Sequence, residues 1–305
     1  MLLEKILEFF GIRKAERFAV ISDIHSNLEA LSVVINDIKE NKISNIYCCG
    51  DIVGYGPNPN ECVEIIKNNK ITSVKGNHDY AVINNNDKVL SWFNSTARDS
   101  IIWTNRELNE KNKDFLKKIP DYFKNNMISI VHGSLNEPIF EYVYPNNLSF
   151  IFEEAEKLEN KILFLGHTHY PFLFAKNKDN SFLLYYYKIK REGEKIIREP
   201  EKISENYRPY CIVRSEIPSK ITETIIIKEY EKVIVNVGSV GQPRDYDNRA
   251  CYVICEFQNS LNKNNPYPEL RISFVRIKYD YDRTKEKILK SGLPEKNAYR
   301  LELGK

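Results

Sequence analysis

Histidine is the informative residue type in this chain. The 305 residues include five histidines, and each lies in a short polar cluster that also contains Gly or Asp. A lone His is usually structural, but a chain with every His in such a setting indicates a functional centre. The clusters read Asp23-Ile24-His25, Gly76-Asn77-His78-Asp79, His132-Gly133 and Gly166-His167-Thr168-His169, and a related pair, Gly50-Asp51, lacks His.

The donor atoms of these clusters indicate a metal site. They are carboxylates, imidazoles and an amide, and no cluster contains Cys. Such N and O donors suit Mn, Fe, Co, Ni or Zn and disfavour metals that prefer thiolates. The donors are too many for one ion with an open position. They fit two ions that share a carboxylate, which can clamp the attacking and leaving oxygens of an in-line displacement.

A short apolar run precedes each cluster and is typical of a buried strand. Ligands in open α/β sheets bind at the carboxyl ends of strands, where these clusters fall. In addition, Asp-x-His and His-x-His place two side chains on one side of an extended segment. The expected strands are 18–21, 46–49, 71–74, 127–131 and 162–165.

Helical patterns alternate with these strands, which predicts an α/β fold. A helix is expected from Leu28 after the capping sequence Ser26-Asn27-Leu28-Glu29. A second is expected from Pro59, with Cys62 in the core. We also expect helix over 92–118, ending before Pro120, strand-like structure from about 181 to 276, and a final helix over about 281–291.

The order of these motifs resembles the calcineurin-like metallophosphoesterase superfamily. Longer matches resemble its prokaryotic YfcE-like phosphodiesterase branch, namely Asp23–Leu31, Asp51–Pro57, Asn236–Asp245 and Gly292–Gly304. The resemblance covers about 17–175 and 230–304. It implies an α/β (α+β) fold in which helices flank a two-sheet β-sandwich, here with a β-rich insertion.

The resemblance also implies roles for individual residues. Asp51 would bridge two divalent metal ions, His78 would protonate the leaving-group oxygen as general acid, and a metal-bridging hydroxide would be the nucleophile. The first ion would be held by Asp23, His25, Asp51 and His169, and the second by Asp51, Asn77, His132 and His167.

Some residues depart from related enzymes of the superfamily. The protein Ser/Thr phosphatases and the symmetrical dinucleoside tetraphosphatases carry an Asp and an Arg where this chain has Gly54 and Tyr55, and a Glu where it has Asp79. Those two activities are therefore poorly supported. Asp79 is a candidate for orienting His78 or contacting substrate, or it faces into a turn. Arg244 is a candidate phosphate contact, or a surface residue paired with Asp245.

Composition sets limits on the function. There are 45 Lys and Arg against 42 Asp and Glu, a net charge of +3, which gives no support for a dedicated polyanion binder. No apolar run is long enough for a transmembrane helix, and Met1–Phe10 lacks the features of a signal peptide. The six Cys show no CxxC pair, which is typical of reduced thiols in a cytoplasmic protein.

The expected domain organisation has three parts. Residues 1–16 form a helical extension, 17–175 with 231–305 form the metallophosphoesterase domain, and 176–230 form a β-hairpin insertion. Met1–Phe10 packs on the core or contacts a partner. The insertion contains Tyr185, Tyr186 and Tyr187 beside Lys188 and Lys190, which are either an ordinary sheet or a surface that stacks bases.

We therefore expect a dinuclear metal-dependent phosphoesterase that hydrolyses phosphodiester or phosphomonoester bonds of a small substrate. One alternative is a nuclease with the same centre, in which 176–230 holds nucleic acid. The other is a binding scaffold of the same fold without catalysis. A homo-oligomer is compatible with the sequence, and no membrane partner is expected.

Overall fold

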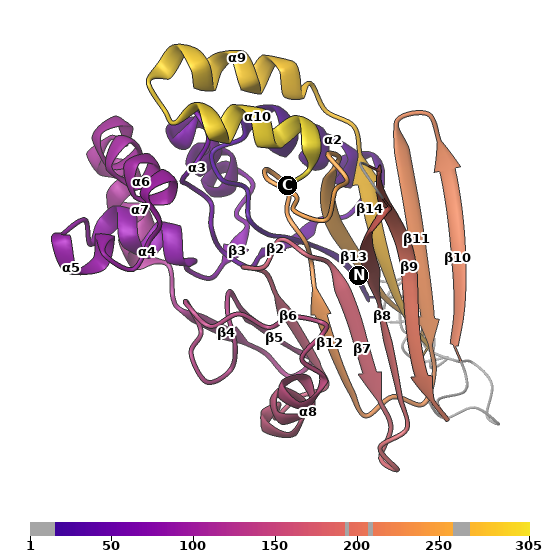
Figure 1. Cartoon of the computed structure of the whole chain (residues 1–305). Helices are drawn as coiled ribbons and strands as arrows, with labels where there is room; N and C mark the ends of the chain where they lie inside the picture. Colours follow the sequence, from indigo (N-terminus) through magenta and orange to yellow (C-terminus); the bar gives the residue numbers. More distant parts are fainter. Residues whose placement is uncertain (1–15, 193–194, 207–209, 259–268) are drawn as a thin grey trace, which may run out of the picture.

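The computed structural model describes residues 16–192, 195–206, 210–258 and 269–305 (Figure 1). The helix predicted over Met1–Phe10 lies outside the described residues. Side chains are described for all of these residues except 191, 192, 195, 196 and 258.

Two sheets of seven strands each form the centre of the molecule and pack face to face (Figure 1). The first has the order β10-β11-β14-β13-β1-β2-β3, and the second has the order β4-β5-β6-β12-β7-β8-β9. The strands of the first sheet are β10 (Tyr210–Ile217), β11 (Lys220–Ile227), β14 (Glu269–Ile277), β13 (Ala250–Gln258), β1 (Glu16–Ile21), β2 (Asn45–Cys48) and β3 (Thr72–Ser73). Those of the second are β4 (Tyr122–Lys124), β5 (Ile128–Val131), β6 (Ile162–Leu165), β12 (Lys232–Asn236), β7 (Phe172–Lys176), β8 (Phe182–Glu192) and β9 (Lys195–Glu205).

The parallel part of each sheet contains the strands expected from the apolar runs. β1, β2 and β3 pair in parallel in one sheet, and β5, β6 and β12 do so in the other. Because parallel neighbours end at the same edge, the polar residues that follow them gather there. The two-sheet α/β sandwich expected from the sequence is confirmed.

Helices cover the outer faces of both sheets (Figure 1). Helix α8 packs on the second sheet, while α9 packs on α2 and α10 packs on α9. The helices are α2 (Leu28–Glu40), α3 (Pro59–Asn68), α4 (Asn77–Ile83), α5 (Asp87–Leu90), α6 (Ser95–Glu107), α7 (Glu110–Lys118), α8 (Leu148–Lys157), α9 (Tyr281–Ser291) and α10 (Glu295–Leu303).

Local sequence sets the helix boundaries. The Asn27 side chain accepts from the backbone N–H of Ala30, so α2 begins where the capping pattern predicts. The range expected to be helical, 92–118, is helical from Ser95 to Lys118 except for a break at Leu108 and Asn109, which divides it into α6 and α7. The Asn94 side chain caps the start of α6, and the Asn109 side chain caps the start of α7. Helix α10 was not predicted.

Apolar side chains fill three layers. Between the sheets lie residues such as Phe18, Phe164 and Val253, which are buried. One outer layer packs the buried face of α2 and Cys62 of α3 against the first sheet, and another packs α8 against the second. Among the described residues, all six cysteines are free, and Cys211 alone is exposed.

The segment 176–230 adds one hairpin to each sheet. β8 and β9 pair antiparallel and extend the second sheet beyond β7, as the hairpin pattern predicted. β10 and β11 extend the first sheet beyond β14. The segment therefore adds two strands to the edge of each sheet of the sandwich. That 176–230 is a separate insertion stays a prediction.

Candidate metal centre

The predicted ligands converge at the edge where the parallel strands of both sheets end. Asp23 and His25 follow β1, Asp51 follows β2, and Asn77 begins α4 after β3. The opposite sheet contributes His132 after β5 and His167 and His169 after β6. All of these side chains are buried. The site therefore lies at the seam between the two sheets.

Two groups of donor atoms meet there, and Asp51 belongs to both. Asp23, His25, Asp51 and His169 offer ligand atoms that lie within 4.8 Å of one another, as do Asp51, His132 and His167. In the first group, His169 Nε2 is 3.2 Å from Asp23 Oδ1, and His25 Nε2 is 3.5 Å from Asp51 Oδ2. In the second, His132 Nε2 is 3.4 Å from Asp51 Oδ2.

The hydrogen bonds fix which imidazole nitrogen faces the centre. His25 Nδ1 lies 3.2 Å from Val53 O, His132 Nδ1 lies 2.8 Å from Cys49 O, and His169 Nδ1 lies 2.5 Å from Gln242 O. Because carbonyl oxygens only accept, each Nδ1 donates, and in a neutral ring this leaves Nε2 as a lone pair.

The lone pairs of His25 and His169 face each other without a proton between them. His25 Nε2 and His169 Nε2 are 3.0 Å apart. In addition, the buried Asp23 Oδ1 has no hydrogen-bond partner. Neighbouring acceptors in a buried site repel unless a cation lies between them. The donor set therefore fits divalent metal ions.

Burial and neighbouring charges set the protonation of the histidines. Burial lowers the pKa of His25 and His169, and it lowers the pKa of His167 to about 3. At His132 the Asp51 carboxylate outweighs burial and raises the pKa to about 9. Neutral imidazoles are the form that binds metals. His132 instead holds a proton that a cation would displace.

The backbone at the site is held in an unusual conformation. Asp23, His25, Asp51, His167 and His169 all have positive φ, between 48° and 65°. Residues other than Gly rarely adopt this region, and such strain gathers at functional sites. Hydrogen bonds across the loops hold it, since His167 N donates to Asp23 Oδ2 and His78 N donates to Asp51 Oδ1.

His78 lies beside the donor groups, and its ring makes no polar contact through Nδ1, which is buried without a partner. Its ring centroid is 4.9 Å from that of His25 and 4.4 Å from that of Tyr55. Burial lowers the pKa of His78 to about 4. Gly54, with φ +97°, packs on this ring, and a Cβ there would lie 2.5 Å from His78 Nδ1. The ring thus occupies the space next to Gly54, where related enzymes carry an Asp.

Asp79 faces away from the cavity into the surrounding loops. Its Oδ1 accepts from Val53 N at 3.1 Å, and its Oδ2 accepts from Gly76 N at 3.1 Å. The carboxylate therefore fastens the loop after β2 to the start of α4. No hydrogen bond between Asp79 and the His78 ring is present among the described residues.

A cavity of about 580 Å³ opens over the donor groups. Asp51, Asn77, His78, His167 and His169 lie at its base, and Arg244 lines it as the sequence suggested. Sequence reasoning missed Arg300 of α10, Tyr55, and the aromatic residues Trp92, Phe93, Phe140 and Tyr142, which also line it. Arg300 lies within Gly292–Gly304, a segment that resembles the YfcE-like branch, and this resemblance could have identified it.

Arg244 and Arg300 are neighbours in this cavity. Each guanidinium lies over the Tyr55 ring, 5.8 Å and 5.9 Å from its centroid. Arg244 donates to Gln242 Oε1, and Arg300 donates to Lys305 O. Within the described part of the chain, no Asp or Glu side chain forms an ion pair with either. Burial and the Arg244 cation lower the pKa of Arg300 to about 10. The pair is therefore suited to an anionic ligand.

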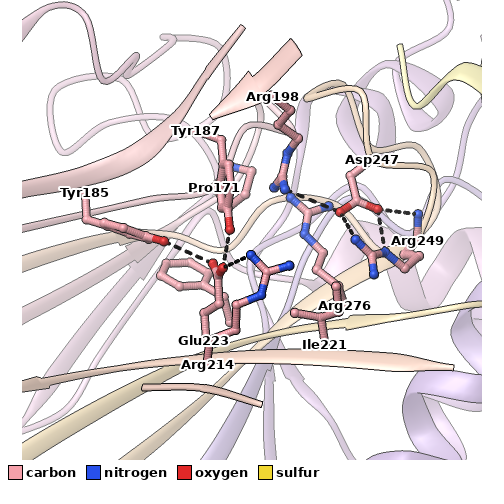
Figure 2. Close-up of a pocket in the computed structure, with 11 residues that line it drawn as sticks. Pro171, Tyr185, Tyr187, Arg198, Arg214, Ile221, Glu223, Asp247, Arg249 and Arg276 are labelled. Carbon is pink, nitrogen blue, oxygen red and sulfur yellow. Dashed lines mark hydrogen bonds and ion pairs between the residues drawn. The ribbon is translucent and has the colours of Figure 1, made fainter. Parts of the chain in front are cut away.

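A second polar cluster joins 176–230 to the loop that carries Arg244 (Figure 2). Arg198 of β9 donates to Asp245 Oδ2 through Nε and Nη2, at 3.1 Å and 2.7 Å, and Arg276 of β14 pairs with the same oxygen. The Arg198 guanidinium also lies 3.4 Å from the centroid of the Tyr187 ring. Of the two alternatives for Arg244, the pairing with Asp245 is not present, because Arg198 and Arg276 bind that carboxylate.

The same cluster buries two of the three consecutive tyrosines. The hydroxyls of Tyr185 and Tyr187 donate to Glu223 between the sheets (Figure 2). These two rings are therefore unavailable to stack on bases, which removes the observation that favoured a nucleic-acid role for this segment.

Comparison with known proteins agrees with the motifs and geometry. Residues 17–185 match the calcineurin-like phosphoesterase superfamily domain. The uncharacterized protein MJ0912 of Methanocaldococcus jannaschii is 36% identical over 292 residues, which cover 94% of this chain and 98% of that protein. The chain therefore belongs to the calcineurin-like phosphoesterase superfamily.

Solved structures include similar proteins. A metallophosphoesterase from Sphaerobacter thermophilus aligns with a TM-score of 0.65 and 29% identity, covering 95% of this chain and 100% of that one. YfcE, a phosphoesterase from E. coli, aligns with a TM-score of 0.37 and 16% identity over 83% of this chain and 96% of that one. The second likeness is too distant to inform the function. Separately, none of the described helices combines the length and the hydropathy that a membrane span requires.

Proposed function

We propose that this protein is a phosphoesterase that uses two divalent transition-metal ions to hydrolyse phosphodiester or phosphomonoester bonds. Asp23, His25, Asp51 and His169 would hold one ion, and Asp51, Asn77, His132 and His167 would hold the other. The observation that carries the proposal is the facing of the unprotonated Nε2 atoms of His25 and His169 across the seam, with Asp51 shared between the two groups of donors.

Bound there, such ions supply Lewis-acid stabilisation of phosphoryl oxygens and lower the pKa of a water nucleophile. The chain's own residues do the rest. Arg244 and Arg300 would bind the anionic phosphate, and preorganised cations stabilise the charge that develops on it. The cavity walls hold the ester next to the donor groups.

His78 would protonate the leaving-group oxygen. Its ring lies at the base of the cavity and its Nδ1 has no protein partner. A pKa of about 4 keeps the ring neutral in the free protein. A phosphate anion beside it favours the charged form, so that substrate binding raises this pKa toward the working range of a general acid.

The competing functions have less support. A nuclease would need a surface that follows a nucleic-acid backbone, and two of the three tyrosines proposed for it, Tyr185 and Tyr187, are buried. A scaffold without catalysis would not require a full donor set beside a buried His with a free ring nitrogen.

The test is metal content measured together with activity. Elemental analysis of metal-supplemented protein should give two ions per chain, and chelation should abolish hydrolysis of bis(4-nitrophenyl) phosphate or 4-nitrophenyl phosphate. Asp51→Asn should lower occupancy of both sites, because the bridging carboxylate neutralises both cations. Asp121→Asn is the control, since Asp121 forms only an exposed pair with Lys75. Full activity with one ion or none would contradict the proposal.

A further inference from the structure

The cavity over the donor groups has an aromatic wall that the proposed chemistry does not use. We call Trp92, Phe93, Phe140 and Tyr142 the aromatic rim. Trp92 and Phe93 lie between α5 and α6, and Phe140 and Tyr142 lie between β5 and α8. Two separate chain segments thus bring aromatic side chains to the same opening.

The aromatic rim runs from the site to solvent without a break. At the inner end, the Tyr142 ring stacks on His167 with centroids 3.7 Å apart and planes 15° apart. The Phe93 ring lies 5.4 Å from His78. At the outer end, the Trp92 ring meets Phe140 edge to face at 5.2 Å. The rim is therefore in contact with both a candidate ligand and the candidate acid.

Two rings of the aromatic rim remain in contact with water. Trp92 is 52% exposed and Tyr142 is 45% exposed, although both line a concave surface. Exposed apolar surface gathered at the mouth of a cavity is typical of a ligand site. Tyr142 already stacks on His167 and on Tyr144, with ring centroids 3.7 Å and 5.6 Å away, so Trp92 is the exposed ring of the rim left to stack on a ligand.

The cavity is lined by both cations and aromatic rings. Arg244 and Arg300 lie at Tyr55 beside His78, and the aromatic rim lines the same cavity. A ligand that satisfies both carries an anionic group and a flat apolar group. The volume of about 580 Å³ is in the range that binds a ligand larger than a bare phosphate.

We propose that the cavity selects phosphate esters that carry a planar aromatic group, with Trp92 as the specificity-determining residue. This inference rests on the proposed phosphoesterase function. A nucleobase and an aryl group share the chemistry in question. Stacking on an aromatic side chain should strengthen binding roughly tenfold to a hundredfold over the same ester without the ring.

Binding to the metal-loaded His78→Ala variant, in which turnover is expected to fall by ~10²–10⁴-fold, tests the proposal while the ligand stays intact. The chain has two tryptophans. Trp103→Phe therefore leaves Trp92 as the sole fluorophore, and AMP or phenyl phosphate should quench its emission. Ribose 5-phosphate and glycerol phosphate provide anions without a ring. Calorimetry should show at least tenfold tighter binding of AMP than of ribose 5-phosphate.

Variants separate the flat ring from simple bulk. Trp92→Leu should reduce the ratio of AMP to ribose 5-phosphate affinity severalfold, and Trp92→Phe should restore most of it. Tyr299→Ala is the matched control, because Tyr299 is 51% exposed but does not line the cavity.

The outcomes also separate this inference from the function on which it rests. Equal affinity for AMP and ribose 5-phosphate, with both ions present, would overturn the selection for aromatic groups and leave the phosphoesterase intact. Failure of every phosphate ester to bind metal-loaded protein would overturn both. A ratio that Trp92→Leu leaves unchanged would remove Trp92 from the role.

Discussion

Removing the Arg198 guanidinium tests whether the hairpin β8–β9 supports the loop that carries Arg244. Asp245 is fully buried, and its Oδ2 accepts two hydrogen bonds from Arg198 as well as one from Arg276. Arg198→Met keeps the length and apolar stem of the side chain but removes both donors to Asp245, the ion pair with Asp247 at 3.5 Å and the contact with Tyr187.

The magnitude follows from what remains after the substitution. Breaking a buried pair and leaving a charge without compensation costs about 3–5 kcal/mol. Here Arg276 still neutralises Asp245, so that figure is an upper limit. Hydrogen bonds to charged groups contribute about 1.5–3 kcal/mol each, and bonds to one oxygen are not additive. We expect Arg198→Met to lower the free energy of unfolding by about 2–3 kcal/mol.

Arg98→Met is the matched control for this measurement. The Arg98 side chain is 47% exposed and pairs with Asp99, which is 59% exposed. Exposed pairs contribute little, so the loss should stay below about 1 kcal/mol. Urea unfolding measures both losses. Hydrogen exchange over 236–249 should rise in Arg198→Met but not in Arg98→Met. Equal losses in the two variants, with no change in exchange, would refute the reasoning.

Three further predictions concern the site and its surroundings. His78→Ala should keep both metal ions, because Asp51 accepts from the backbone N–H of residue 78, which the substitution leaves in place. Turnover should fall by ~10²–10⁴-fold. Loss of metal on elemental analysis would make His78 a ligand instead. Gly54→Ala should lower turnover by displacing the His78 ring, and combining it with His78→Ala should cost no more than His78→Ala alone; additive losses would show that Gly54 acts elsewhere. Burial raises the pKa of Asp247, but the cations of Arg276, Arg249 and Arg198 outweigh burial and lower this pKa well below its usual range. The stability that the Asp247 carboxylate contributes is therefore complete above about pH 4 and is lost as the pH falls further. Asp247→Asn should therefore flatten the dependence of unfolding free energy on pH below pH 4, and an unchanged slope in acid denaturation would contradict this.

The sequence predicted the parts of the fold that follow from local pattern. The apolar runs before Asp23, Asp51 and His132 are strands, because a buried parallel strand needs a short, continuous β-branched run. The break between α6 and α7 was missed although Asn109 is a good helix cap, since apolar spacing continued across it.

Side-chain direction and contacts distant in sequence could not be predicted. Nothing local to Asp79 indicates that it bonds to Gly76 and Val53. Arg300 and Trp92 reach the same cavity from segments about 200 residues apart along the chain, and only the packing of α10 and the loop before α6 brings them together. The ligand cluster was predicted because its residues are rare and its motifs resemble a known family.

The position of the donor groups at the seam has a consequence for folding. Asp23, His25, Asp51 and Asn77 belong to one sheet, while His132, His167 and His169 belong to the other, so the complete set exists only in a chain whose two sheets have closed on each other. A cation bound by both sheets binds the native state and not the unfolded chain, and at a concentration of 1,000 times its dissociation constant it would stabilise the native state by about 4 kcal/mol. The metal ligands and their ions would then also cross-link two halves of the chain that are made at different times during synthesis. The supply of metal would set how long a newly made chain resists proteolysis.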